Sequence, residues 1–144
     1  MIYLDSSALV KLIISEQETV ALHMYLSEHG STLLTCELAL TEVLRVVRRS
    51  CYNPQRQLQV SADVLDQRMN ATGELLDSID RIVVDTDTFL RAGMAADDPH
   101  LGTLDAIHLV CAIEVGPELT AFITYDQVLA RAAERQQLRV TSPQ

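Results

Sequence analysis

The sequence opens on a strand-like run that ends in an acid, Ile2-Tyr3-Leu4-Asp5-Ser6-Ser7-Ala8-Leu9. Apolar residues lead directly to Asp5, and apolar residues resume after the two serines. Asp is a favoured helix N-cap, so Asp5 can be interpreted as the cap of a following helix. It can also be interpreted as a charge placed at the end of a buried strand, where α/β proteins build their sites. The remaining acids of the chain bear on this choice.

Short apolar runs alternate with helical patterns along the whole chain. Strands are expected at residues 2–4, 32–35, 81–84, 121–125 and 138–140. Helices are expected at about 7–29 with a break near Ser15, 37–51, 54–78 with an interruption at Gly73, after Asp85, 103–115 and 127–136. Strands that alternate with helices predict an α/β domain with a mostly parallel central sheet.

Length and composition favour one cytoplasmic domain. The 144 residues are 48% hydrophobic, enough for a core, and no apolar stretch is long enough to span a bilayer. A strand-like segment follows Met1 at once, so we expect no secretory signal. The scattered Cys36, Cys51 and Cys111 are expected to be buried, reduced thiols.

The net charge of −9 argues by itself against a protein that binds nucleic acid. Acids that bind divalent cations would invert this local charge. The basic residues are also unevenly spread, since Arg45, Arg48 and Arg49 lie close together. They are candidates to contact RNA phosphates; the alternative is that they are solvated or pair with acids.

Four acids occupy positions that favour a shared site. Asp5 and Asp126 each end an expected strand, so in a parallel sheet both would lie at the same edge. Glu42 interrupts the apolar helix LALTEVLRVV, and Asp105 opens the apolar helix TLDAIHLVCAI. An acid buried in such a helix is costly unless it is paired or bound to a metal.

Each of these acids also has an ordinary structural interpretation. Asp5 and Asp126 could cap the helices that follow them. Glu42 could pair with Arg45 on the helix surface, and Asp105 could be stabilised by the helix dipole. Converging carboxylates instead repel one another unless a cation binds, and Mg²⁺ and Mn²⁺ prefer oxygen ligands. Such a site can activate water and stabilise displacement at phosphorus.

The order and setting of these acids resemble the PIN-domain family, and within it the VapC-type toxins of bacterial toxin–antitoxin pairs. The resemblance covers essentially the whole chain and rests on four segments, MIYLDSSALVKL, ELALTEVLRVVRR, LDAIHLVCA and FITYDQVLARAA. It implies a three-layer α/β/α sandwich with a short parallel sheet, as a single domain of residues 1–144 with a helical hairpin inserted at about 54–78. It also implies an endoribonuclease dependent on Mg²⁺ or Mn²⁺.

The resemblance assigns roles residue by residue. Asp5, Glu42, Asp105 and Asp126 match the family's acidic metal-binding residues, with Asp5 and Asp105 as the expected direct ligands. Ser7 and Thr124 match small hydroxyl residues that support the site. The implied partners are RNA and a VapB-like antitoxin that blocks the acidic pocket, and homodimers are usual in the family.

Several assignments stay open at this point. His108 follows Asp105 by one helical turn and is expected to pack beside the site rather than bind the metal. Asp97 and Asp98 are rival ligands by type, although their place before Pro99 favours a turn. The apolar stripe of Leu58, Ala62, Leu65 and Met69 suits core packing or contact with an antitoxin or a second copy.

Other classes of protein fit less well. A phosphoacceptor receiver domain needs a lysine after a late strand, and a haloacid-dehalogenase-type phosphatase needs a second Asp where Ser7 stands. Lys11 is the single lysine and lies in neither place. The remaining alternative is a catalytically inactive PIN-like module that binds RNA or protein.

Overall fold

A five-stranded parallel sheet organises the protein. The computed structural model describes residues 1–94 and 100–144. The strands pair in the order β3-β2-β1-β4-β5, and all four pairings are parallel. Their bounds are β1 Ile2–Leu4, β2 Leu33–Cys36, β3 Asp80–Ile82, β4 Ala121–Ile123 and β5 Val140–Thr141. The predicted α/β fold with a short parallel sheet is confirmed.

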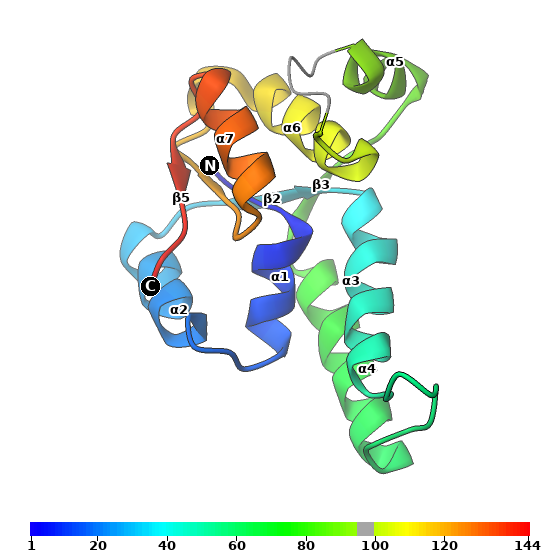
Figure 1. Cartoon of the computed structure of the whole chain (residues 1–144). Coiled ribbons are helices and arrows are strands. Elements are labelled where there is room, and N and C mark those ends of the chain that lie inside the picture. Colours follow the sequence, from blue (N-terminus) through cyan, green and yellow to red (C-terminus); the bar gives the residue numbers. More distant parts are fainter. Residues whose placement is uncertain (95–99) are drawn as a thin grey trace.

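Helices cover both faces of this sheet, which confirms the three layers (Figure 1). One face carries α1 Ser6–Ile13, α2 Thr19–His29, α3 Leu38–Ser50 and α4 Ala62–Asp77. The other carries α5 Thr86–Met94, α6 Thr103–Val115 and α7 Gln127–Arg135. A short 3₁₀ turn, Gly116–Glu118, leads from α6 towards β4.

The central strand β1 is buried on both faces, as its continuous apolar sequence predicts. Ile2 and Leu4 pack into the core beneath α1 and α3, whereas Tyr3 points into the core beneath α6 and α7. The Tyr3 ring stacks on Phe122 of β4, with 5.4 Å between ring centroids. This alternation fixes the strand's register, so the residue after Leu4 emerges at a defined place on the sheet edge.

Most element boundaries lie within one or two residues of those predicted, and the first helical region divides as expected near Ser15. The predicted interruption at Gly73 is wrong, because α4 runs through it. Nothing lies within 4 Å of the position a Cβ would take at Gly73. A glycine inside a helix costs only about 1 kcal/mol, which packing can offset. That the chain forms a single domain stays a prediction.

The segment before α4 also differs from the prediction. Residues 54–61 form a loop, so Leu58 does not lie on the predicted helical stripe. The Asn53 side chain accepts a hydrogen bond from the Gln57 backbone at 2.8 Å, and Leu58 forms an antiparallel bridge with Tyr52. These bonds satisfy hydrogen-bonding groups of the loop within the loop itself and its neighbour Tyr52. The observed helical hairpin consists of α3 packed on α4, not of two helices within 54–78.

Two expectations from composition can be compared with the structure. None of the helices in residues 1–94 and 100–144 is long and apolar enough to cross a membrane. Cys36, Cys51 and Cys111 are free and buried, as predicted.

The two phenylalanines provide a matched test of the core. Phe122 is fully buried against Tyr3, so Phe122→Ala should lower the free energy of unfolding by about 3–5 kcal/mol. Phe89 on α5 is 50% exposed, and Phe89→Ala should cost less than about 1 kcal/mol. Urea unfolding of both variants measures the difference. Equal losses would contradict the described core.

Candidate active site

Asp5 lies at the carboxyl end of β1 and is almost fully buried, with 3% of its surface exposed. Its Oδ1 accepts hydrogen bonds from the Ser7 hydroxyl at 2.7 Å and from the Ala8 backbone at 2.9 Å. Asp5 therefore caps α1. Burial raises the pKa of its carboxyl, although the bonds from Ser7, Ala8 and Thr124 act in the opposite direction. Capping and a role in the site are compatible, since the carboxylate has two oxygens with further lone pairs.

Thr124 connects Asp5 to Asp126. Its buried hydroxyl donates to Asp5 Oδ2 at 2.7 Å and accepts a bond from the Asp126 backbone at 3.1 Å. β1 and β4 are adjacent parallel strands, so their ends meet at one sheet edge as predicted. Asp126 is exposed and caps α7, with its Oδ1 accepting from the Val128 and Leu129 backbones.

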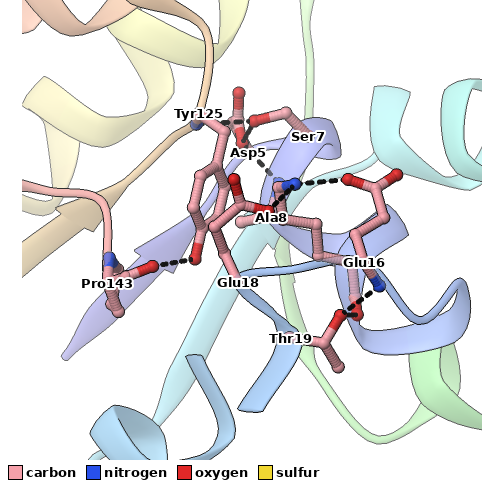
Figure 2. A network of polar contacts seen from close by, with 9 residues as sticks. Asp5, Ser7, Ala8, Glu16, Glu18, Thr19, Tyr125 and Pro143 are labelled. Atoms are coloured by element: carbon pink, nitrogen blue, oxygen red, sulfur yellow. Dashed lines mark hydrogen bonds and ion pairs between the residues drawn. The ribbon is translucent and has the colours of Figure 1, made fainter. Parts of the chain in front are cut away.

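Ser7 provides a second connection between the two strand ends (Figure 2). Its hydroxyl donates to Asp5 and accepts a hydrogen bond from the Tyr125 backbone at 2.8 Å. The Tyr125 hydroxyl in turn donates to the Pro143 carbonyl at 3.0 Å. The ammonium of Lys11 lies 4.6 Å from the centre of the Tyr125 ring and is ion-paired with Glu16 and Glu18. The start of α1 is thus fixed against β4 and the C-terminal segment.

Glu42 enters the site from α3 through a hydrogen-bonded chain. Its Oε2 accepts from the Ser6 hydroxyl at 2.6 Å and lies 2.8 Å from His108 Nε2. The His108 Nδ1 lies 2.9 Å from the Tyr3 hydroxyl. Within the described part of the chain, Glu42 pairs with Ser6 and His108 and not with Arg45, so the surface-pair interpretation is wrong.

His108 is almost completely buried, with 1% of its surface exposed. Burial lowers its pKa, but hydrogen bonds to Cys36 and Glu42 outweigh burial and raise the pKa to about 10. The charged imidazolium then faces the Glu42 carboxylate and lowers the pKa of Glu42, against the effect of its partial burial. His108 therefore packs beside the acids and orients one of them.

Asp105 stands in the first turn of α6, whose buried residues run from Ala106 to Ala112 as predicted. Burial raises the pKa of the Asp105 carboxyl, and the Asp126 carboxylate raises it further, with smaller contributions from Asp5 and Glu42. The charges of the other three acids therefore all act on Asp105. No hydrogen-bond donor among the described residues satisfies the Asp105 carboxylate. A Cβ on Gly102 would lie 2.7 Å from Asp105 Oδ2, so a larger residue there would displace the Asp105 carboxylate.

This donor set suits a hard divalent cation. It consists of carboxylate and hydroxyl oxygens, the ligand types that Mg²⁺ and Mn²⁺ prefer. Burial and then the neighbouring carboxylates raise the pKa of Asp105, and a bound cation would offset both effects. Across residues 1–94 and 100–144, no three His, Cys, Asp or Glu side chains are already arranged as metal ligands. Mg²⁺ keeps several waters and needs only one or two carboxylates, so it does not require such a cage.

The other candidates lie elsewhere. Arg45, Arg48 and Arg49 do not join the acids but line a hollow with Tyr52 and Arg56, towards the end of α3. Asp97 and Asp98 lie outside the described residues. The contacts of Ser6 with Glu42 and of Tyr3 with His108 were not predicted. The one signal in the sequence was that Ser6 is adjacent to Asp5.

Comparison with known proteins agrees with this architecture. The PIN domain family model matches residues 2–135. Ribonuclease VapC47 of Mycobacterium tuberculosis is 37% identical over 132 residues, covering 90% of this chain and 87% of the relative. Ribonuclease VapC35 of the same species is 36% identical over 147 residues, covering 99% and 97%. The crystal structure of M. tuberculosis VapC20, a toxin that cleaves the sarcin–ricin loop, superposes with a TM-score of 0.71 at 14% identity, covering 92% of this chain and 95% of that one.

A parallel sheet with Asp5 and Asp126 at the carboxyl ends of adjacent strands defines an α/β domain with an acidic site at one sheet edge. With these matches, the chain belongs to the PIN-domain family and, within it, to the VapC group. The resemblance seen in the sequence is confirmed.

The hydroxyl of Thr124 can be tested with an isosteric pair. Thr124→Val leaves Asp5 Oδ2 and the Asp126 backbone without a partner and should lower the free energy of unfolding by about 1–3 kcal/mol. Thr124→Ser keeps the hydroxyl and should lose clearly less. Urea unfolding of both proteins gives the comparison. A serine variant as unstable as the valine variant would show that the hydroxyl is unimportant.

The pair of Glu42 and His108 predicts a pH dependence. The pKa of His108 is raised from 6.5 to about 10 by folding, so its protonation stabilises the fold fully below pH 6.5. This contribution is lost as the pH rises towards 10. Glu42→Gln removes a charged acceptor and should make this loss of stability smaller. Unfolding measured across this range checks it, with the exposed Glu74→Gln as the control. An unchanged pH dependence in Glu42→Gln would refute the pairing.

Proposed function

We propose that this protein is a cytoplasmic, metal-dependent endoribonuclease toxin that cleaves RNA and so inhibits translation and growth. The observation that carries the proposal is the meeting of Asp5 and Asp126 at one sheet edge, where the Thr124 hydroxyl joins them. The charges of these two acids and of Glu42 also act on Asp105. The ribonuclease names of its VapC relatives support RNA as the substrate. An acidic, cation-binding site also reconciles the net charge of −9 with a polyanionic substrate.

The metal-binding role falls to the four acids. Asp5 and Asp105 are the proposed direct ligands of Mg²⁺ or Mn²⁺, and Glu42 and Asp126 complete the pocket directly or through water. The bound ion would supply charge neutralisation and an activated water for displacement at phosphorus.

The surrounding side chains position these acids. Ser7 and Thr124 hold the two oxygens of Asp5 in place, so its carboxylate cannot rotate freely. His108 and Ser6 orient Glu42 in the same way. Side chains that fix the ligands of a metal are typically worth 10–100-fold in affinity or activity, by order of magnitude.

The proposed partner is a VapB-like antitoxin that covers the acidic pocket and silences the enzyme. The membership of the chain in the VapC group supports this partner. A homodimer, or a hetero-oligomer of toxin and antitoxin, is the proposed assembly.

Cleavage of labelled RNA tests the activity. The purified, antitoxin-free protein should cut RNA with Mn²⁺ or Mg²⁺ and leave it intact with EDTA. Asp5→Asn should reduce cleavage by about 100-fold or more and relieve growth inhibition, while keeping the fold, because it removes charge from a crowded acidic cluster.

Asp63→Asn is the matched control, since Asp63 is exposed on α4. Intact RNA under all three conditions would favour an inactive binding module instead. Undiminished cleavage by Asp5→Asn would remove Asp5 from the site.

A further inference from the structure

A hollow lies apart from the acidic cluster, at the end of α3. Four arginines line it, together with Tyr52: Arg45, Arg48, Arg49 and Arg56. The hollow is open and measures about 710 Å³. No acidic side chain is among its lining residues. The chain has only eleven lysines and arginines against twenty acids. Four of these eleven basic residues line this one hollow, so positive charge is concentrated there.

These guanidinium groups are not explained by pairing within the protein. Among the described residues, no carboxylate forms an ion pair with Arg45, Arg48, Arg49 or Arg56. Arg48 and Arg49 lie in the last turn of α3, where positive charge is favourable next to the helix dipole. That effect does not account for Arg45, one turn earlier, or for Arg56 in the loop. All four guanidinium groups are exposed, so they give this face a concentrated positive charge that suits an anionic ligand.

Local hydrogen bonds hold the loop that carries Arg56 in a defined conformation. Asn53 bonds both the backbone and the side chain of Gln57, and Leu58 bridges to Tyr52. Arg56 itself has a φ of 62°, a conformation that residues with side chains rarely adopt. The loop thereby brings Arg56 to the same hollow as the arginines of α3.

We propose that this hollow is an anchoring site for single-stranded RNA, separate from the place of cleavage. The proposal rests on the proposed ribonuclease function. Guanidinium groups bind phosphates through paired donors, and both they and Tyr52 offer flat faces on which bases stack. An acidic protein segment would match the charge but would leave these flat faces without planar partners.

The position of the hollow supports an RNA strand that continues from the acidic cluster. Arg45 and Arg49 follow Glu42 by three and seven residues, so all three lie on one side of α3. At about 1.5 Å per residue, Arg49 stands roughly 10 Å along the helix from Glu42. That distance is short enough for one RNA strand to reach both places. The anchor would hold the substrate beside the cut and thereby set its affinity and its required length.

Binding without cleavage isolates this anchor. In the Asp5→Asn background, fluorescence anisotropy would follow a labelled single-stranded RNA of about 12 nucleotides between about 50 and 200 mM salt. Arg49→Gln with Arg56→Gln should weaken binding roughly tenfold or more. The slope of log affinity against log salt should become shallower by about 0.7 for each arginine removed. Arg49→Lys with Arg56→Lys should keep most of the slope, since the charge stays.

Arg139→Gln is the control: it removes the same charge from an exposed position next to β5. β5 is the edge strand beyond β4, whereas α3 packs on β2 on the other side of the central strand (Figure 1). Unchanged RNA affinity and salt slope in the glutamine pair would overturn the anchor. The anchor would also be overturned if the glutamine pair lost binding to a poly-glutamate probe but still bound RNA as tightly as the parent protein. Failure of the proposed function is distinguishable, because then the wild-type protein would not cleave RNA in the metal assay at all.

Discussion

The burial of Asp5 at the end of the central strand is the constraint on which the rest of the site depends. A carboxylate with 3% exposure must be hydrogen-bonded to be tolerated, and the protein meets this need with Ser7, Ala8 and Thr124. Each of these partners also fixes another element: the first turn of α1 or the end of β4. Satisfying one buried charge therefore determines how a helix and two strands meet.

The acids around Asp5 also form contacts that hold other elements in place. Asp126 caps α7, while the chain from Ser6 through Glu42 and His108 to Tyr3 ties α3 and α6 to the central strand. Asp105 is the exception, since burial and then neighbouring carboxylates raise its pKa and no described donor satisfies it. The cluster is thus held together by structural bonds on three acids and leaves the fourth as the place where a cation would bring the largest relief.

The backbone arrangement could be predicted from the sequence because it depends on local patterns. The apolar run before Asp5 predicts a buried strand, and parallel strands bring Asp5 and Asp126 to one edge. The partners of His108 could not be predicted in this way, because Tyr3 lies 105 residues away and meets it only through packing. The prediction of a helix from residue 54 is wrong because a hydrogen bond to the Asn53 side chain, and not apolar periodicity, determines the path of the loop before α4. The cluster of Arg45, Arg48 and Arg49 could be seen in the sequence, but the place of Arg56 beside it depends on that loop and could not be predicted.

Thermal unfolding with and without Mn²⁺ tests most directly whether the acids form one cation site around Asp105. Because folding raises the Asp105 pKa, the ionised carboxylate destabilises the fold at neutral pH. In EDTA, the thermal unfolding midpoint of Asp105→Asn should therefore lie roughly a few °C above that of the wild type. Mn²⁺ should raise the midpoint of the wild type and of the exposed Asp66→Asn control, but not that of Asp105→Asn. A wild type that Mn²⁺ does not stabilise, or an Asp105→Asn variant stabilised equally, would contradict the account.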